Sequence, residues 1–169
     1  MRLLRNHRWF LATPLAALAM LATTISPAAA EPLSNCTANL TIMTTSTGVE
    51  RQAGPVELFT NSGVGGGYTS GFLAGYTISG AQDIVMNTET HKSVLTGQFV
   101  ARGAGGTLTV HYVGRADLNT GAATGHFVAG SGTGSFTNFV WEGSITAQLV
   151  SLTPPTFHAT DSGTCFPPR

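Results

Sequence analysis

Four polar side chains stand out in a stretch that is otherwise rich in strand-forming residues: His111, Arg115, His126 and Glu142. His111 and Arg115 are four positions apart, so in a β-strand they project from the same face. Such a pair in an apolar cavity could bind a carboxylate or an enolate, with Glu142 or His126 accepting a proton. We therefore predict that these four residues bind a ligand, with Tyr76 in its apolar wall. No catalytic residue is assigned.

The alternative is that the polar face of this strand meets solvent. Leu108, Val110 and Tyr112 occupy the opposite face from His111 and Arg115. If these apolar residues fill the interior of a barrel, both polar side chains are solvated, and this is the commoner arrangement in a small barrel. The sequence alone leaves the direction of the two faces open.

The sequence contains no complete nucleotide-binding, serine-hydrolase or metal-binding motif. The Gly-x-Gly-x-Gly of residues 130–134 is followed by neither a helical pattern nor a Gly-Lys-Ser/Thr ending, so we interpret it as a hairpin turn rather than a nucleotide loop. There is no Gly-x-Ser-x-Gly elbow. The histidines after residue 30 lack metal-ligand spacing. We expect no metal and no cofactor.

The first thirty residues have the organisation of a secretory signal. Arg2, Arg5 and Arg8 precede an apolar run over residues 9–25, and small residues end the segment at Ala30. We predict a signal peptide over residues 1–30 and a single domain over residues 31–169, secreted or periplasmic. The alternative is a retained membrane anchor, since about 17 apolar residues reach the lower limit of a spanning helix.

Charge restricts the partners of residues 31–169. Five basic and eight acidic residues give this part a net charge of −3, and the basic residues form no cluster. Without a basic cluster to neutralise phosphates, nucleic acid is an unexpected partner. We expect no membrane association after signal cleavage, and the oligomeric state stays open.

The two cysteines, Cys36 and Cys165, lie near opposite ends of the predicted domain. An even pair in an exported protein is most simply a disulfide, and we prefer it to a redox or nucleophilic role. The bridge would bring the first and last strands together, as in a sheet that closes on itself.

The apolar residues after Glu31 repeat with a period of two, which is typical of strands. We predict strands at about 35–46, 55–60, 67–79, 93–102, 107–117, 122–129, 133–141, 143–151 and 156–161. Glycine-rich turns are expected at 63–67 and 103–106, and residues 81–91 carry a weak helical pattern.

Short strands separated by glycine turns indicate an all-β fold, either a small antiparallel β-barrel of about eight strands or a β-sandwich. Glycines inside the strands favour the barrel, because strands must coil sharply to close. We expect apolar walls from aromatic side chains: Tyr68, Phe72, Tyr76, Phe127 and Trp141.

A family resemblance appears between Val110 and Ala147. Gly125-His126-Phe127, the Gly-Ser-Gly-Thr-Gly-Ser-Phe run of residues 130–136 and Trp141-Glu142-Gly143 resemble the C-terminal hairpins of allene oxide cyclase-like barrels, a group that includes the dirigent proteins. The resemblance implies a barrel with a ligand-sized cavity. It brings no catalytic motif.

The leading interpretation is therefore an exported barrel that binds a small, largely apolar ligand in its cavity. One alternative is a cyclase or isomerase on the same scaffold, acting on a reactive apolar substrate by confinement. Another is a secreted structural or adhesive module without a pocket. The lining of the lumen discriminates them.

Overall fold

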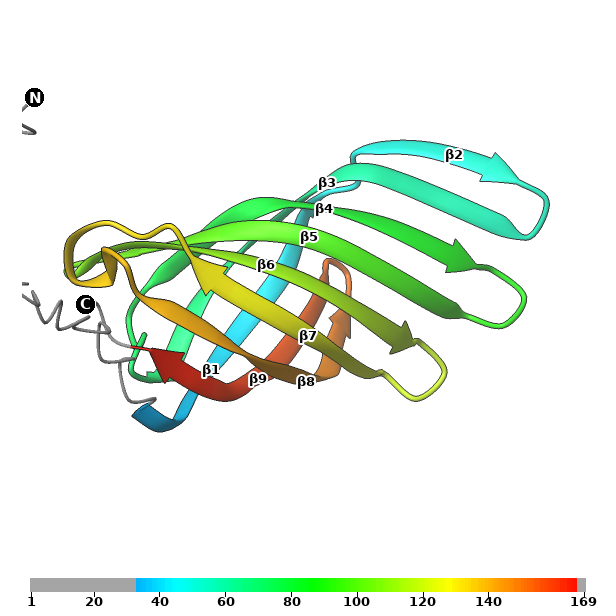
Figure 1. Cartoon of the computed structure of the whole chain (residues 1–169). Coiled ribbons are helices and arrows are strands. Elements are labelled where there is room, and N and C mark those ends of the chain that lie inside the picture. The colour runs from blue at the N-terminus through cyan, green and yellow to red at the C-terminus, as the bar shows by residue number, and fades with distance from the viewer. Residues whose placement is uncertain (1–32, 167–169) are drawn as a thin grey trace, which may run out of the picture.

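The computed structural model describes residues 33–166 and consists almost entirely of strands (Figure 1). The elements are β1 (Leu33–Ser46), β2 (Val49–Ala53), β3 (Val56–Gly71), β4 (Thr77–Asn87), β5 (Lys92–Gly103), β6 (Gly106–Asp117), β7 (Ala122–Gly130), the 3₁₀ helix η1 (Gly134–Phe136), β8 (Val140–Leu152) and β9 (Pro155–Phe166). The predicted signal peptide lies outside the described residues. No helix within residues 33–166 is long and apolar enough to cross a membrane.

Eight of the nine described strands form a closed antiparallel barrel. The sheet runs in the order β1-β9-β8-β7-β6-β5-β4-β3, and β1 also pairs with β3, which closes the ring. β2 pairs with β3 outside the ring as a short hairpin. The predicted small antiparallel barrel is thus confirmed, and the sandwich alternative is not the fold.

Three predictions for the first half of the chain differ from the structure. The expected strand at 67–79 is interrupted by a turn, because β3 ends at Gly71 and β4 begins at Thr77. The weakly helical segment 81–91 belongs mostly to β4, where Gln82 faces inward and the flanking Asp83 is exposed. The expected turn at 63–67 lies inside β3, where this strand passes from β2 to β1 as its partner. Gly66 has a φ of +140° there, and a Cβ at this position would clash with the Thr41 carbonyl oxygen. The glycines therefore let two backbones approach, rather than ending a strand.

The expected strand at 133–141 is also different. Most of it forms η1 and a loop, and β8 begins only at Val140. Phe136 and Phe139 of this segment are buried, because they pack with each other (ring centroids 5.4 Å apart) over one end of the barrel. The apolar residues of this segment are therefore buried aromatic side chains of a loop, and they do not reflect the alternation of a strand.

Aromatic packing and the disulfide close this end of the barrel. The ring centroid of Trp141, which is fully buried, lies 4.4 Å from that of Phe127 and 4.8 Å from that of Phe72. Cys36 of β1 and Cys165 of β9 form the predicted disulfide, with their Cα atoms 5.8 Å apart. The first and last strands of the barrel are therefore linked covalently at the closed end.

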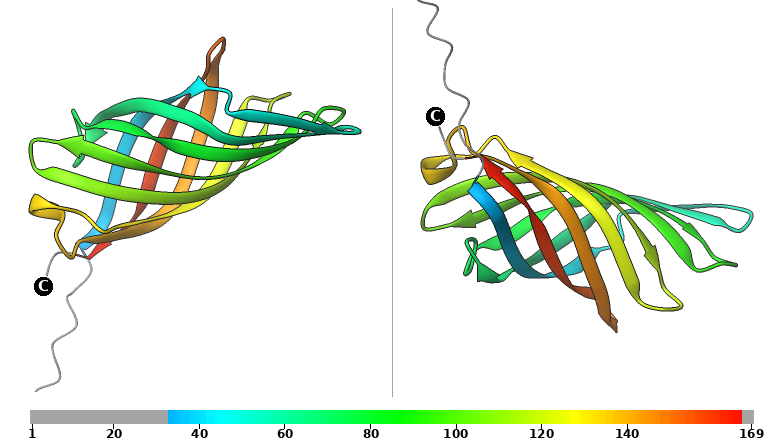
Figure 2. Two further views of the ribbon diagram at one scale, coloured as in Figure 1. Left: turned by 90° about the horizontal axis from the view of Figure 1, so that it is seen from above. Right: turned by 60° about the horizontal axis from the view of Figure 1, so that its bottom comes forward.

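The opposite end of the barrel is open. The hairpins β2–β3, β4–β5 and β6–β7 protrude past the end of the β8–β9 hairpin (Figures 1 and 2). The β3 residues Val56–Phe59 pair with β2 and β4 rather than with β1, so here the sheet is no longer part of a closed ring. Its inner face continues from the lumen as an open surface.

Candidate ligand site

The predicted polar residues lie on the outer face of the barrel. His111, Arg115, His126 and Glu142 are all exposed. On β6 the inward positions belong to the other set of residues, with Leu108 fully buried. Exposure of the polar face is the lower-energy arrangement, because burying an arginine without an anionic partner costs several kcal/mol. The inward His111–Arg115 pair, on which their proposed role depended, is not formed, and of the four residues Arg115 alone borders the cavity described below.

Tyr76 lies at the closed end, away from the open mouth. Its ring packs edge-on against Phe136, with centroids 5.7 Å apart. Its hydroxyl oxygen accepts a 2.8 Å hydrogen bond from the Gly105 backbone N–H. The predicted wall residue thus anchors the β5–β6 turn to the aromatic cluster at this end.

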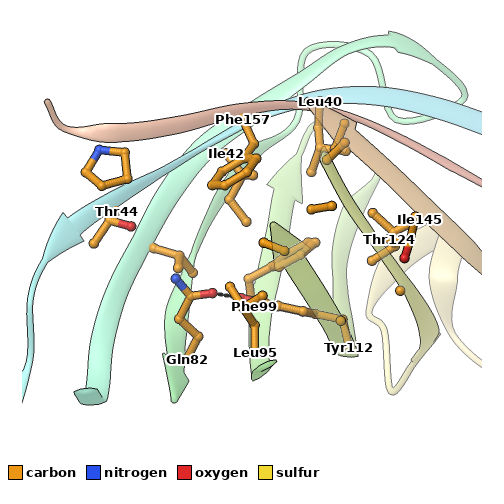
Figure 3. Close-up of a pocket in the computed structure, with 18 of the residues that line it drawn as sticks. Leu40, Ile42, Thr44, Gln82, Leu95, Phe99, Tyr112, Thr124, Ile145 and Phe157 are labelled. Carbon is orange, nitrogen blue, oxygen red and sulfur yellow. Dashed lines mark hydrogen bonds between the residues drawn. The ribbon is translucent and has the colours of Figure 1, made fainter. Parts of the chain in front are cut away.

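An apolar cavity of about 90 Å³ occupies the open half of the lumen (Figure 3). Leu40, Ile42 and Phe157 line one side of it, and Phe99 and Tyr112 line the other. Leu95, Ala123 and Pro155 lie among the lining residues toward the mouth. The side chains that point into this cavity come from strands all around the barrel, so its shape depends on closure.

The first polar pair in the cavity spans three strands. Gln82 of β4 is paired with Gly97 of β5, which is paired with Tyr112 of β6. The Tyr112 hydroxyl donates a 2.8 Å hydrogen bond to Gln82 Oε1 across the glycine (Figure 3). A Cβ on Gly97 would lie 2.7 Å from this hydroxyl oxygen and 2.7 Å from Gln82 Cβ. The hydrogen bond between Tyr112 and Gln82 therefore requires that residue 97 carry no side chain.

The second polar pair crosses β1. The Tyr68 hydroxyl of β3 donates a 3.0 Å hydrogen bond to Asp161 Oδ2 of β9. On the intervening strand, Leu40 pairs with Tyr68 and the fully buried Ala38 pairs with Asp161. Asp161 is only 2% exposed and lies between Ala38 and Ile145 of the flanking strands. Tyr68 is the one donor that residues 33–166 supply to this carboxyl.

Burial decides the protonation of Asp161. Desolvation raises its pKa to about 7, and the hydrogen bond from Tyr68 opposes this only in part. Burial and the nearby carboxyl raise the pKa of Tyr68, and burial raises that of Tyr112, so both tyrosines keep their protons. The lumen thus carries an acid that can change charge near neutral pH, within hydrogen-bond reach of a permanent donor.

Sequence reasoning missed Asp161 as a site residue, although a signal was present. Asp161 is two strand steps from Cys165, and the period of two puts both on the same face. Once Cys165 is taken as a buried disulfide partner, Asp161 must also point into the barrel. Tyr68 was expected only as an apolar wall, and its hydrogen bond needed the closure of β1 onto both β3 and β9.

Comparison with protein families, with curated proteins and with solved structures found no match. The resemblance of the C-terminal hairpins to allene oxide cyclase-like barrels therefore stays a prediction.

Proposed function

We propose that this chain is an exported barrel protein that binds a small, largely apolar ligand through the open end of its lumen. The observation that carries the proposal is the apolar cavity at that end, with two hydrogen-bonded polar pairs in its wall. A concave, mainly apolar site with a few fixed polar groups is the usual form of a small-molecule site. The ligand gains from burial and is oriented by Asp161 or Gln82.

The ligand extends past the cavity. A volume of about 90 Å³ is smaller than the roughly 150 Å³ of an engineered cavity that holds benzene. From Leu95 at the mouth outward, Phe59, Ile84 and Met86 continue the inward face of the protruding strands, and all four residues are only partly buried. We call these four residues the apolar shelf. It provides a surface for the part of the ligand that the cavity does not hold.

Binding and transport of a ligand fit this lumen better than a structural role or catalysis by a cyclase or isomerase. A structural module would be served by a lumen filled throughout, whereas aromatic rings fill the closed end and leave a cavity at the other. A cyclase or isomerase would be served by a cavity that surrounds its substrate and excludes water. An apolar mouth that continues onto an open shelf supports uptake and release of an unchanged ligand.

Fluorescence titration with N-phenyl-1-naphthylamine, an uncharged apolar dye, tests the proposal. We expect the dye to bind with increased emission, and Ala147→Phe, which fills the cavity from β8, to abolish binding. Thr146→Phe is the matched control, because Thr146 is the exposed neighbour on the same strand. Absence of dye binding, or equal binding by both variants, would refute a lumenal site.

A further inference from the structure

The cavity holds a buried acid for which residues 33–166 supply no ion pair. The Asp161 carboxyl lies among apolar residues of the lumen, and its hydrogen bond comes from an uncharged tyrosine. A buried carboxylate is strongly disfavoured unless a cation or several donors compensate it. The described chain supplies one donor, so a ligand that brings positive charge would complete the site.

Charge is divided between the two faces of the sheet. The basic side chains on the barrel strands alternate with inward apolar or small residues. All basic side chains within residues 33–166 are exposed: Arg51, His91, Lys92, Arg102, His111, Arg115, His126 and His158. The inner face carries acids instead. Glu57 pairs with Met86 of the apolar shelf, and Glu50 pairs with Phe59 of the shelf. Near the mouth a cation therefore meets Glu50 and Glu57 on the inner face of the protruding strands, while the exposed Arg115 borders the cavity from β6.

We propose that the ligand is an apolar primary amine whose ammonium group binds the Asp161 carboxylate while its hydrocarbon part occupies the cavity and the apolar shelf. This inference rests on the proposed function and adds the chemical class of the ligand. An ammonium group brings a positive charge and further N–H donors to a carboxyl that accepts one hydrogen bond, from Tyr68. An alcohol supplies only a hydrogen bond, and a fatty acid adds a second negative charge beside Asp161.

Binding of an amine also depends on pH in a defined direction. Tyr112 of β6 lines the cavity and Tyr68 of β3 contacts Asp161, and both stay protonated. Arg115 of β6 also borders the cavity, and an arginine keeps its charge throughout this pH range. An aliphatic amine is charged throughout this pH range, so Asp161 alone changes charge. Because its pKa is about 7, amine affinity should fall as the pH drops below 7, approaching about tenfold per pH unit.

The test is displacement of N-phenyl-1-naphthylamine by three probes with the same alkyl chain: n-hexylamine, 1-hexanol and hexanoate. We expect n-hexylamine to compete best at pH 8 and hexanoate worst. Asp161→Asn should weaken n-hexylamine by about tenfold, the scale of a charge-assisted hydrogen bond, and leave 1-hexanol unchanged. Glu142→Gln, which removes an exposed acid on the outer face, is the control and should change neither.

The outcomes separate the two proposals. Dye binding with equal competition by all three probes, or amine competition unchanged in Asp161→Asn, overturns the amine and leaves a general apolar site. No dye binding overturns the proposed function itself. If Asp161→Asn does not fold, the wild-type protein decides the matter: n-hexylamine must lose affinity between pH 8 and pH 5.5 while 1-hexanol does not, and equal behaviour of the two overturns the inference.

Discussion

The Tyr112 hydroxyl reaches over Gly97 to hydrogen-bond Gln82, two strands away. Tyr68 reaches Asp161 across β1, where Leu40 pairs with Tyr68 and Ala38 pairs with Asp161. At Gly97 the absent side chain leaves the gap that the Tyr112 ring occupies. The polar groups of the lumen are therefore held by pairs that form only when three adjacent strands are in register.

A side chain added at Gly97 should destabilise the barrel. Gly97→Ala places a Cβ within 2.8 Å of the Tyr112 ring and should displace it, lowering the free energy of unfolding by about 1–3 kcal/mol. Urea unfolding measures the change. Gly130→Ala is the control, because the nearest atom to its added Cβ is a carbonyl oxygen at 3.8 Å. Equal stability of the two variants would mean that the Tyr112–Gln82 pair does not depend on this gap.

Asp161 should make stability decrease as the pH rises. Its pKa is raised from 3.8 in the unfolded chain to about 7 in the folded protein, so between these values the folded state holds a proton that the unfolded state has released. The free energy of unfolding should fall from about pH 4 to about pH 7, by an amount on the order of 3–4 kcal/mol, and then level off.

The measurement is the urea midpoint between pH 4.5 and pH 8 for the wild type and for Asp161→Asn. The variant should lose this decrease, because an amide does not titrate. Glu142→Gln, an exposed acid, should keep it. A wild-type and an Asp161→Asn curve of the same slope would show that the buried carboxyl is ionised throughout.

The disulfide closes most of the domain into one loop, since Cys36 and Cys165 have a sequence separation of 129. Replacing both cysteines by serine should cost about 4–5 kcal/mol, because the unfolded chain regains its loop entropy. Thermal unfolding of the oxidised protein, the reduced protein and the double variant measures the effect. The reduced wild type should match the double variant, and an oxidised protein no more stable than either would contradict this account.

Two outer-face substitutions test the placement of the residues that the sequence singled out. His111→Ala and Arg115→Met should each change stability by less than about 0.5 kcal/mol, since exposed side chains without specific partners contribute little. Dye binding should be unchanged in His111→Ala, because Arg115 borders the cavity and His111 does not. Loss of binding in His111→Ala would return His111 to the ligand site.

Export is tested by the mass of the protein recovered outside the cytoplasm. We expect a chain that begins at Glu31, since small residues at Ala28 and Ala30 suit a signal peptidase. The disulfide supports an oxidising compartment. A recovered mass that still includes residues 1–30 would favour the retained membrane anchor.

The period of two was enough to predict an all-β fold, because alternation is a local property of each strand. The disulfide could be predicted because an exported chain with two cysteines most simply pairs them. The same reasoning missed β2 and misplaced the turn at 63–67. Glycine has two uses, ending a strand and admitting a neighbouring backbone, and only the pairing of β3 with β1 shows which applies.

The candidate site depended on a choice that the sequence could not make. Alternation shows that His111 and Arg115 share one face of β6 and that Leu108 and Val110 share the other, but not which face is inside. Closure decides it, because the barrel buries the face whose desolvation costs least. Tertiary structure also brings Asp161 to Tyr68 and Gln82 to Tyr112, since each pair joins strands that meet only around the ring.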